Sequence, residues 1–191
     1  MRTSIVLFGV LHHPIILAFA QAILMLVFLT GAWSKLRARE TFEGVVYNYR
    51  LLPGFAVAPV SYLLPLTELA SGLGLAFAVT RPYAAIGAVL LLAVFNIAIA
   101  INLLRGRREI DCGCFSAVLK QRLSGSLIVR NLALMILAAW LAWGAPQAGA
   151  AVWLDWLVGL AAALVAVFVY MGATVLAAQS RRSHNNSEPA G

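Results

Sequence analysis

The sequence predicts an all-α fold, a polytopic membrane helix bundle with about five transmembrane helices. Of the 191 residues, 62% are hydrophobic and 11% are charged, whereas about 25% of the residues are charged in ordinary soluble domains. A soluble domain of this length cannot bury so much apolar surface. The charged residues are also grouped, so that five long stretches carry few or none. Each stretch exceeds the roughly 20 apolar residues that a helix needs to cross a bilayer core.

The first two predicted spans are Pro14–Lys35 and Val57–Val79. No Asp, Glu, Lys or Arg occurs in residues 3–34, and Pro14 suits the first turn of a helix, where a missing N–H costs nothing. This stretch is too long for a simple signal peptide, so we expect a helix of the mature protein. The second span lies in a stretch whose single charged residue is Glu68.

The remaining predicted spans are Pro82–Leu104, Leu127–Gly144 and Val152–Ala178. The third contains no charged residue, and the charge-free stretches 131–154 and 156–180 cover most of the fourth and fifth. After them the chain turns polar, and its Ser, Asn, Glu and Pro content is typical of disorder. We therefore expect one transmembrane domain, residues 1–180, followed by a disordered tail, residues 181–191.

The basic residues predict the orientation in the membrane. Five spans place the two ends of the chain on opposite sides. Of the 14 Lys and Arg residues, Arg2 and Arg81 fall on the N-terminal side and the other twelve on the C-terminal side. The positive-inside rule then predicts that the N-terminus lies outside and that the C-terminus and the loop after the third span lie at the cytoplasmic face. The basic residues lie on short membrane loops, so we expect the lipid bilayer and not a nucleic acid as their partner.

Polar residues within the spans form a second pattern. An ionised Glu68 near the middle of its span would be costly, so we expect it to face the bundle interior, to pair with a cation, or to stay protonated. Five other strongly polar residues lie in or beside the cytoplasmic halves of spans: Lys35, Asn96, Asn102, Arg130 and Asn131. One interpretation is a polar pocket. The alternative is that Lys35 and Arg130 extend to the headgroups and that the asparagines hold helices together.

The two cysteines of the chain, Cys112 and Cys114, are separated only by Gly113, in a charged loop between the third and fourth spans. A disulfide requires Cα atoms about 4.4–6.8 Å apart, and glycine permits the tight turn that this demands. Such a small ring is strained and readily reduced. Neighbouring arginines favour the thiolate, whereas Glu109 and Asp111 oppose it, so the direction of the thiol pKa shift stays open. The alternative to redox chemistry is a pair of inert thiols.

No metal or cofactor is expected from the sequence. His12 and His13 precede the first span, across the membrane from Cys112 and Cys114, so these four residues do not make a metal site. The chain has no glycine motif for nucleotides. A quinone could serve as the terminal electron partner, although no residue pattern specifies one.

Four segments together resemble a known family. They are GAWSKLRARETFEGVVYNYRLLP (31–53), LPLTELASGLGL (64–75), INLLRGRREIDCGCFS (101–116) and IVRNLALMILA (128–138). These segments look like the methylamine utilisation protein MauE family, and the resemblance covers about residues 14–144. Its specific part is the RGRxxIDCGCF stretch, whereas the hydrophobic remainder is common to many membrane proteins.

The resemblance implies a membrane accessory for maturation of the methylamine dehydrogenase small subunit, by disulfide formation, processing or export. That client is a periplasmic polypeptide with many disulfides and a tryptophan-derived quinone, and a thioredoxin-like protein, MauD, is the implied partner. Cys112 and Cys114 are then the candidate redox pair, with Glu68 and Lys35 as pocket residues. Whether the protein is itself a thiol–disulfide oxidoreductase stays open.

Two other functions stay open as well. The protein could be a non-catalytic assembly or export factor, in which the cysteines form only a structural clasp, or a small-molecule transporter that uses Glu68 as its coupling site. The implied client also matures in the periplasm, whereas the basic residues place the cysteine loop on the cytoplasmic side. Either the loop is reached from the periplasm, or the orientation is reversed.

Overall fold

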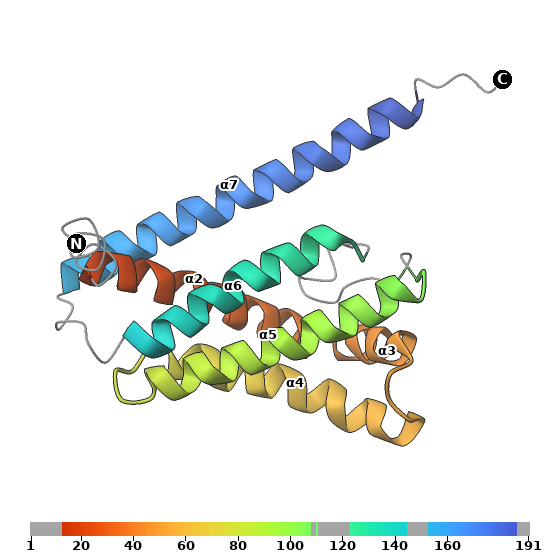
Figure 1. The fold of residues 1–191 in the computed structure, drawn as a ribbon, viewed down its shortest axis with the longest axis horizontal. Helices are drawn as coiled ribbons and strands as arrows, with labels where there is room; N and C mark the ends of the chain where they lie inside the picture. The colour runs from red at the N-terminus through yellow and green to blue at the C-terminus, as the bar shows by residue number, and fades with distance from the viewer. Residues whose placement is uncertain (1–12, 108–109, 111–122, 145–152, 187–191) are drawn as a thin grey trace, which may run out of the picture.

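The computed structural model describes residues 13–107, 110, 123–144 and 153–186 of the chain, and in these ranges all regular secondary structure is α-helical (Figure 1). Five of the helices are long and apolar enough to cross a membrane, which confirms the predicted fold class. The helices are α2 (Pro14–Arg37), α3 (Arg39–Tyr49), α4 (Gly54–Gly74), α5 (Arg81–Leu104), α6 (Gly125–Gly144) and α7 (Trp153–Asn186).

The predicted spans begin close to the observed helices, and the larger differences lie at their ends. α4 ends at Gly74, before the predicted Val79, because the hydroxyl of Thr80 donates a hydrogen bond to the Gly74 carbonyl at 2.7 Å and closes the turn to α5. α7 continues to Asn186, into the segment predicted to be a disordered tail. No proline or glycine interrupts the chain between Gly172 and Pro189, so nothing in the backbone forces an earlier end.

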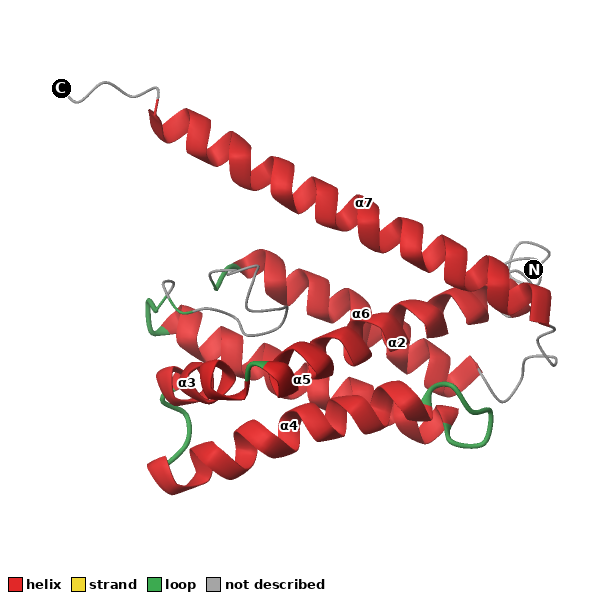
Figure 2. Ribbon diagram, turned by 180° about the vertical axis from the view of Figure 1, so that it is seen from behind, coloured by secondary structure: helices red, strands yellow, loops and turns green. Residues whose placement is uncertain are grey.

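The short helix α3 was not predicted. It follows α2 after Ala38, whose ψ of 49° breaks the helix, and it ends at Arg50 in the left-handed conformation, with φ 49°. Its sequence mixes charged and apolar residues, and Phe42 is its one buried residue. α3 packs against α4 near the end of α2 (Figure 2). It is too short to cross a bilayer. It lies instead at one end of the bundle (Figure 2).

α2 is the central helix of the bundle. It packs against α4 on one side and α7 on the other, and it also contacts α6, which runs along α5 (Figure 1). Half of its apolar span is buried, compared with 11% for α7. The main core draws on α2, α5 and α6 and on the end of α4, with buried side chains from Leu17, Leu24, Phe28, Leu75, Ala85, Ala88, Leu92, Ala138 and Leu141.

α7 joins the bundle through a close approach to α2. A Cβ atom added at Gly159 would lie 2.8 Å from the carbonyl carbon of Ala18 and 2.8 Å from the amide nitrogen of Phe19. Ala163, one turn further, is fully buried. Small residues four positions apart let transmembrane helices pack closely. Beyond this contact α7 diverges from the bundle (Figure 1), and Phe168 is 72% exposed.

Gly159→Ala is therefore expected to destabilise the docking of α7 by about 1–3 kcal/mol, because the added methyl group meets backbone atoms that cannot rotate away. The matched control is Gly172→Ala in the same helix, where a Cβ would meet nothing within 4 Å. Thermal unfolding of the two variants in detergent micelles measures the difference. Equal melting temperatures would show that α7 does not pack on α2 at Gly159.

Candidate functional site

A buried ion pair joins α2 and α4 in the interior of the bundle. The Nζ atom of Lys35 donates hydrogen bonds to both carboxylate oxygens of Glu68, at 2.6 and 2.7 Å. Both side chains are at most 5% exposed. Of the alternatives that the sequence leaves open for Glu68, the structure shows pairing with a cation. Lys35 points inward, so the interpretation that it extends to the headgroups is wrong.

Gly72 explains why α2 and α4 come close enough to bury this pair. It lies one turn after Glu68, and a Cβ there would lie 2.9 Å from Leu29 Cδ2 and 3.3 Å from Phe28 Cβ. Pro65, which is fully buried, removes one backbone N–H from α4 just before Glu68. Glu68 is thus flanked by the small residue Gly72 and by Pro65, which interrupts the backbone hydrogen bonds of α4.

Two aromatic rings complete the surroundings of the Lys35 ammonium group. Its Nζ atom lies 5.2 Å from the ring centroid of Phe95 on α5 and 5.6 Å from that of Phe42 on α3. An aromatic face attracts a cation at this distance, and more strongly where water is excluded. No sequence pattern predicts these two residues, because phenylalanines that face a core or a lipid are common in membrane helices.

A small cavity of about 30 Å³ lies beside the ion pair, where α2, α4, α5 and α6 meet. Its polar lining residues are Lys35, Glu68, Arg130 and Asn131, and apolar side chains such as Phe28 and Leu134 line the rest. A cavity of this volume suits a group of about the size of a water molecule. The structure therefore brings four of the polar residues predicted to form a pocket, Lys35, Glu68, Arg130 and Asn131, to one place.

Arg130 and Asn131 form the α6 side of this cavity. The guanidinium group of Arg130 donates hydrogen bonds from Nε and Nη2 to Asn131 Oδ1, at 3.4 and 3.2 Å. The side-chain amide nitrogen of Asn131 is buried and has no hydrogen-bond partner in the part of the chain that the structure describes. A buried donor of this kind favours an acceptor in the cavity, such as a water molecule.

Asn96 and Asn102 are buried on α5, but neither lines the cavity. The side-chain amide of Asn102 donates to the Ala98 carbonyl at 3.0 Å. Within the described ranges, both polar side-chain atoms of Asn96 and the oxygen of Asn102 lack partners. The predicted pocket residue Asn96 is therefore inside the bundle but separate from the Lys35–Glu68 site.

The candidate redox residues Cys112 and Cys114, and with them Asp111, lie outside the described residues. The helices that flank their segment are described: α5 ends at Leu104 and α6 begins at Gly125. These two helix ends lie at the same end of the bundle as α3 (Figure 2). The two helix ends that flank the cysteine segment thus lie at the end of the bundle where α2, which carries Lys35, also ends (Figure 2).

Residues 13–144, which include all of α2 to α6, match the family described as methylamine utilisation protein MauE. The chain is 41% identical to methylamine utilization protein MauE of Paracoccus denitrificans, over 95% of this chain and 97% of that protein. The protein of the same name from Methylorubrum extorquens is 42% identical, over 88% and 90% of the two chains. No solved structure shows significant similarity. The chain therefore belongs to the methylamine utilisation protein MauE family.

Proposed function

We propose that this protein is a membrane accessory for maturation of the methylamine dehydrogenase small subunit, acting through a reversible disulfide between Cys112 and Cys114. Membership of the MauE family supports the general role in methylamine utilisation. The observation that carries the specific role is the position of the two cysteines of the chain, one residue apart in the segment between α5 and α6. Gly113 between them permits the tight turn that a bond at this spacing requires.

The proposed reaction is an exchange with a thioredoxin-like partner of the MauD type. A thiolate of one protein attacks the disulfide of the other, a mixed disulfide forms, and the second thiol of the attacking protein resolves it. One disulfide breaks for each disulfide that forms, and two electrons and two protons pass between the proteins. The chain has no further cysteine, so electrons enter or leave the pair through another molecule.

The buried ion pair supports this proposal because it stabilises the helix bundle to which the cysteine segment is connected. Lys35 and Glu68 lock α2 to α4, and Arg130 lines the same cavity from the first turns of α6. A reactive segment is most effective when the elements that flank it are rigid. A transporter would instead use Glu68 as a coupling site. The bidentate pairing with Lys35 favours the structural role, because it already engages both carboxylate oxygens.

Thiol trapping in intact membranes tests the proposal. A membrane-permeant alkylating reagent is applied before and after reduction, and the mass shift reports the number of free thiols. We expect both cysteines to resist alkylation in part of the population and to react fully after reduction. Complete alkylation without reduction, in cells with and without the thioredoxin-like partner, would contradict a redox role.

The orientation is a separate proposal, with a periplasmic N-terminus and a cytoplasmic C-terminus in the inner membrane. It depends on the twelve-to-two distribution of the 14 basic residues. Alkaline phosphatase fused at Arg81, the first residue of α5, should be active, whereas the same enzyme fused after Gly191 should be inactive. A fluorescent protein that folds only in the cytoplasm should give the opposite pattern. Phosphatase activity from the C-terminal fusion would overturn the orientation.

A further inference from the structure

A larger cavity, of about 320 Å³, lies between α3, α4 and α5. Its lining is almost entirely apolar and includes Phe42, Val46, Tyr49, Leu64, Phe95 and Ala98. Burial raises the pKa of the Tyr49 hydroxyl above its usual range, so this group is neutral at physiological pH. The lining also includes Leu52 and Ile97, which are exposed on the outer surface of the bundle. The cavity therefore opens sideways, where the surrounding solvent of a membrane protein is lipid.

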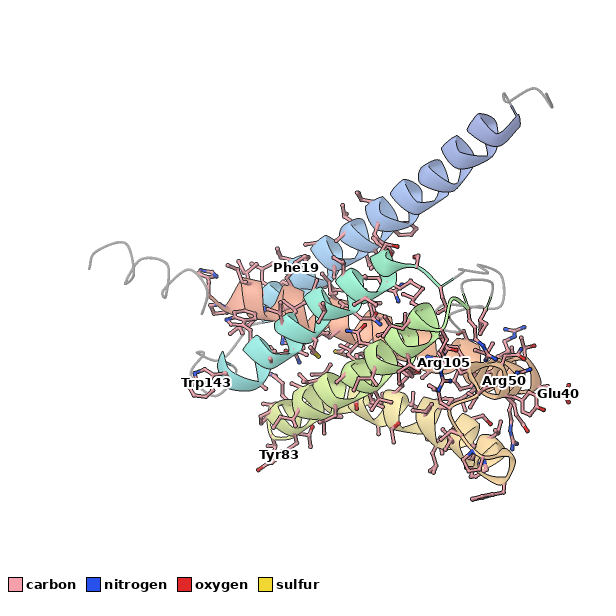
Figure 3. The ribbon with its side chains drawn as sticks, turned by 45° about the vertical axis from the view of Figure 1, so that its right-hand side comes forward. Phe19, Glu40, Arg50, Tyr83, Arg105 and Trp143 are labelled. Carbon is pink, nitrogen blue, oxygen red and sulfur yellow. The ribbon has the colours of Figure 1, made fainter. Side chains whose placement is uncertain are left out.

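Three arginines gather at the rim of this cavity. Arg50 is exposed and lies in the chain between two lining residues, Tyr49 and Leu51. Arg105 donates a hydrogen bond from Nη1 to the Arg50 carbonyl at 3.3 Å, which brings the end of α5 against the end of α3 (Figure 3). Arg107 donates from Nη1 to the Asn48 carbonyl at 3.5 Å. These contacts hold the guanidinium groups of Arg105 and Arg107 at the end of α3, close to the exposed residue Arg50 and to the apolar cavity.

The acidic residues of α3 are distant from this arginine cluster, which we define as Arg50, Arg105 and Arg107. Glu40 and Glu43 lie ten and seven residues before Arg50, which at 1.5 Å per helical residue is about 15 and 10 Å along the helix. They are therefore poorly placed to neutralise the cluster. Each guanidinium group has five N–H donors in a planar fork that suits phosphate oxygens.

We propose that this site binds an anionic phospholipid, with an acyl chain in the 320 Å³ cavity and the phosphate group on the arginine cluster. The apolar cavity and the arginine cluster lie side by side, which fits an amphiphile with an apolar tail and an anionic head. Basic pockets between transmembrane helices bind anionic headgroups in this way. A zwitterionic lipid would gain less, because its own cation accompanies the phosphate.

Native mass spectrometry of the purified protein tests the proposal. The protein is equilibrated in micelles that contain equal amounts of phosphatidylglycerol and phosphatidylcholine, and the lipid that stays bound is identified by mass. We expect phosphatidylglycerol to be retained in preference. Each change among Arg50→Gln, Arg105→Gln and Arg107→Gln should reduce this preference about fivefold, which corresponds to the ~1 kcal/mol that a basic residue contributes near an anionic surface.

The matched control is Arg37→Gln, which removes an exposed positive charge at the last residue of α2, before α3 begins, and should leave the preference unchanged. Equal retention of the two lipids by the unmodified protein would overturn the proposal. So would a loss of preference in Arg37→Gln as large as that in Arg50→Gln, because it would indicate a general charge effect.

A second pair of variants tests whether the site binds a lipid or only a free phosphate ion. Ala98 lines the cavity, so Ala98→Leu and the bulkier Ala98→Trp should fill it and reduce lipid retention while the arginine cluster stays intact. Thermal unfolding in the same micelles shows whether each variant is folded. If both folded variants retain phosphatidylglycerol as the unmodified protein does, and inorganic phosphate displaces it, the site binds the anion alone and the proposal is wrong.

Discussion

Glu68→Gln is expected to destabilise the helix bundle by about 3–5 kcal/mol, because it leaves Lys35 as an uncompensated charge in the interior. The Nζ atom of Lys35 makes two short hydrogen bonds to the carboxylate, and both side chains are almost fully buried. Glutamine is similar in size but carries no charge, so it cannot replace the counter-ion. Thermal or SDS-induced unfolding in micelles measures the loss.

The double variant Lys35→Met, Glu68→Gln should recover much of this loss. Removing both charges leaves no unpaired ion, and a buried pair replaced by well-packed neutral side chains is often close to neutral in stability. The two single variants and the double variant form a thermodynamic cycle, which isolates the coupling between the two groups. Glu40→Gln is the control for the loss of an exposed carboxylate in α3 and should change stability by less than about 0.5 kcal/mol.

The same variants distinguish structural from transport roles of the pair. If the double variant is folded and still supports maturation of the dehydrogenase, the pair serves the bundle and not the chemistry. If it is folded but inactive, the charges themselves are needed, and the transporter hypothesis gains support. An unchanged stability of Glu68→Gln would show that the ion pair does not form in the membrane.

The transmembrane helices could be predicted because membrane insertion imposes a local rule on the sequence. A span needs a long stretch without charges, and that property can be read without knowledge of any contact. The prediction that α4 carries a residue in need of a partner came from the same rule, since Glu68 interrupts an apolar stretch. The predicted ends of α4 and α7 were less accurate. The hydrogen bond from the Thr80 side chain sets the end of α4, and α7 continues as a helix well beyond Gly172.

The partner of Glu68 could not be chosen from the sequence. Lys35 and Arg130 lie at similar depths, and the choice depends on the register between α2 and α4, which the packing at Gly72 sets. Gln21 shows the same limit: it lies in a charge-free span, yet its side chain is buried and donates a hydrogen bond to the Leu75 carbonyl. Such pairings are properties of helix contacts between residues far apart in the sequence.

α3 and the large cavity beside it were beyond sequence analysis for a related reason. The segment is short, its charges suggest a loop, and its one buried residue is Phe42. The helix covers the apolar chamber, and its end places Arg50 against Arg105. A helix whose stability depends mainly on contacts with its neighbours leaves only a weak pattern in its own residues.

Cys112→Ser and Cys114→Ser are each expected to abolish maturation of the methylamine dehydrogenase small subunit while leaving membrane insertion intact. Serine has nearly the size of cysteine but cannot form a disulfide, so the exchange reaction stops at either position. The measurement is the yield of active dehydrogenase in cells that carry each variant, together with the amount of the variant in the membrane fraction. Ser116→Ala, a small change in the same segment, is the control and should retain full maturation.

The single variants also test the exchange mechanism against the structural clasp. In an exchange, the partner's disulfide is attacked by one cysteine and the mixed disulfide is resolved by the other, so a covalent complex with the thioredoxin-like protein should accumulate in one single variant and not in both. A clasp predicts no such complex. It also predicts that Cys112→Asn with Cys114→Gly, which preserves a compact turn, restores maturation, since these residues favour tight turns. Full maturation in the double Cys→Ser protein would exclude thiol chemistry altogether and leave the assembly factor as the function. If every cysteine replacement abolishes maturation and the mixed disulfide is trapped, the two sulfur atoms themselves must react.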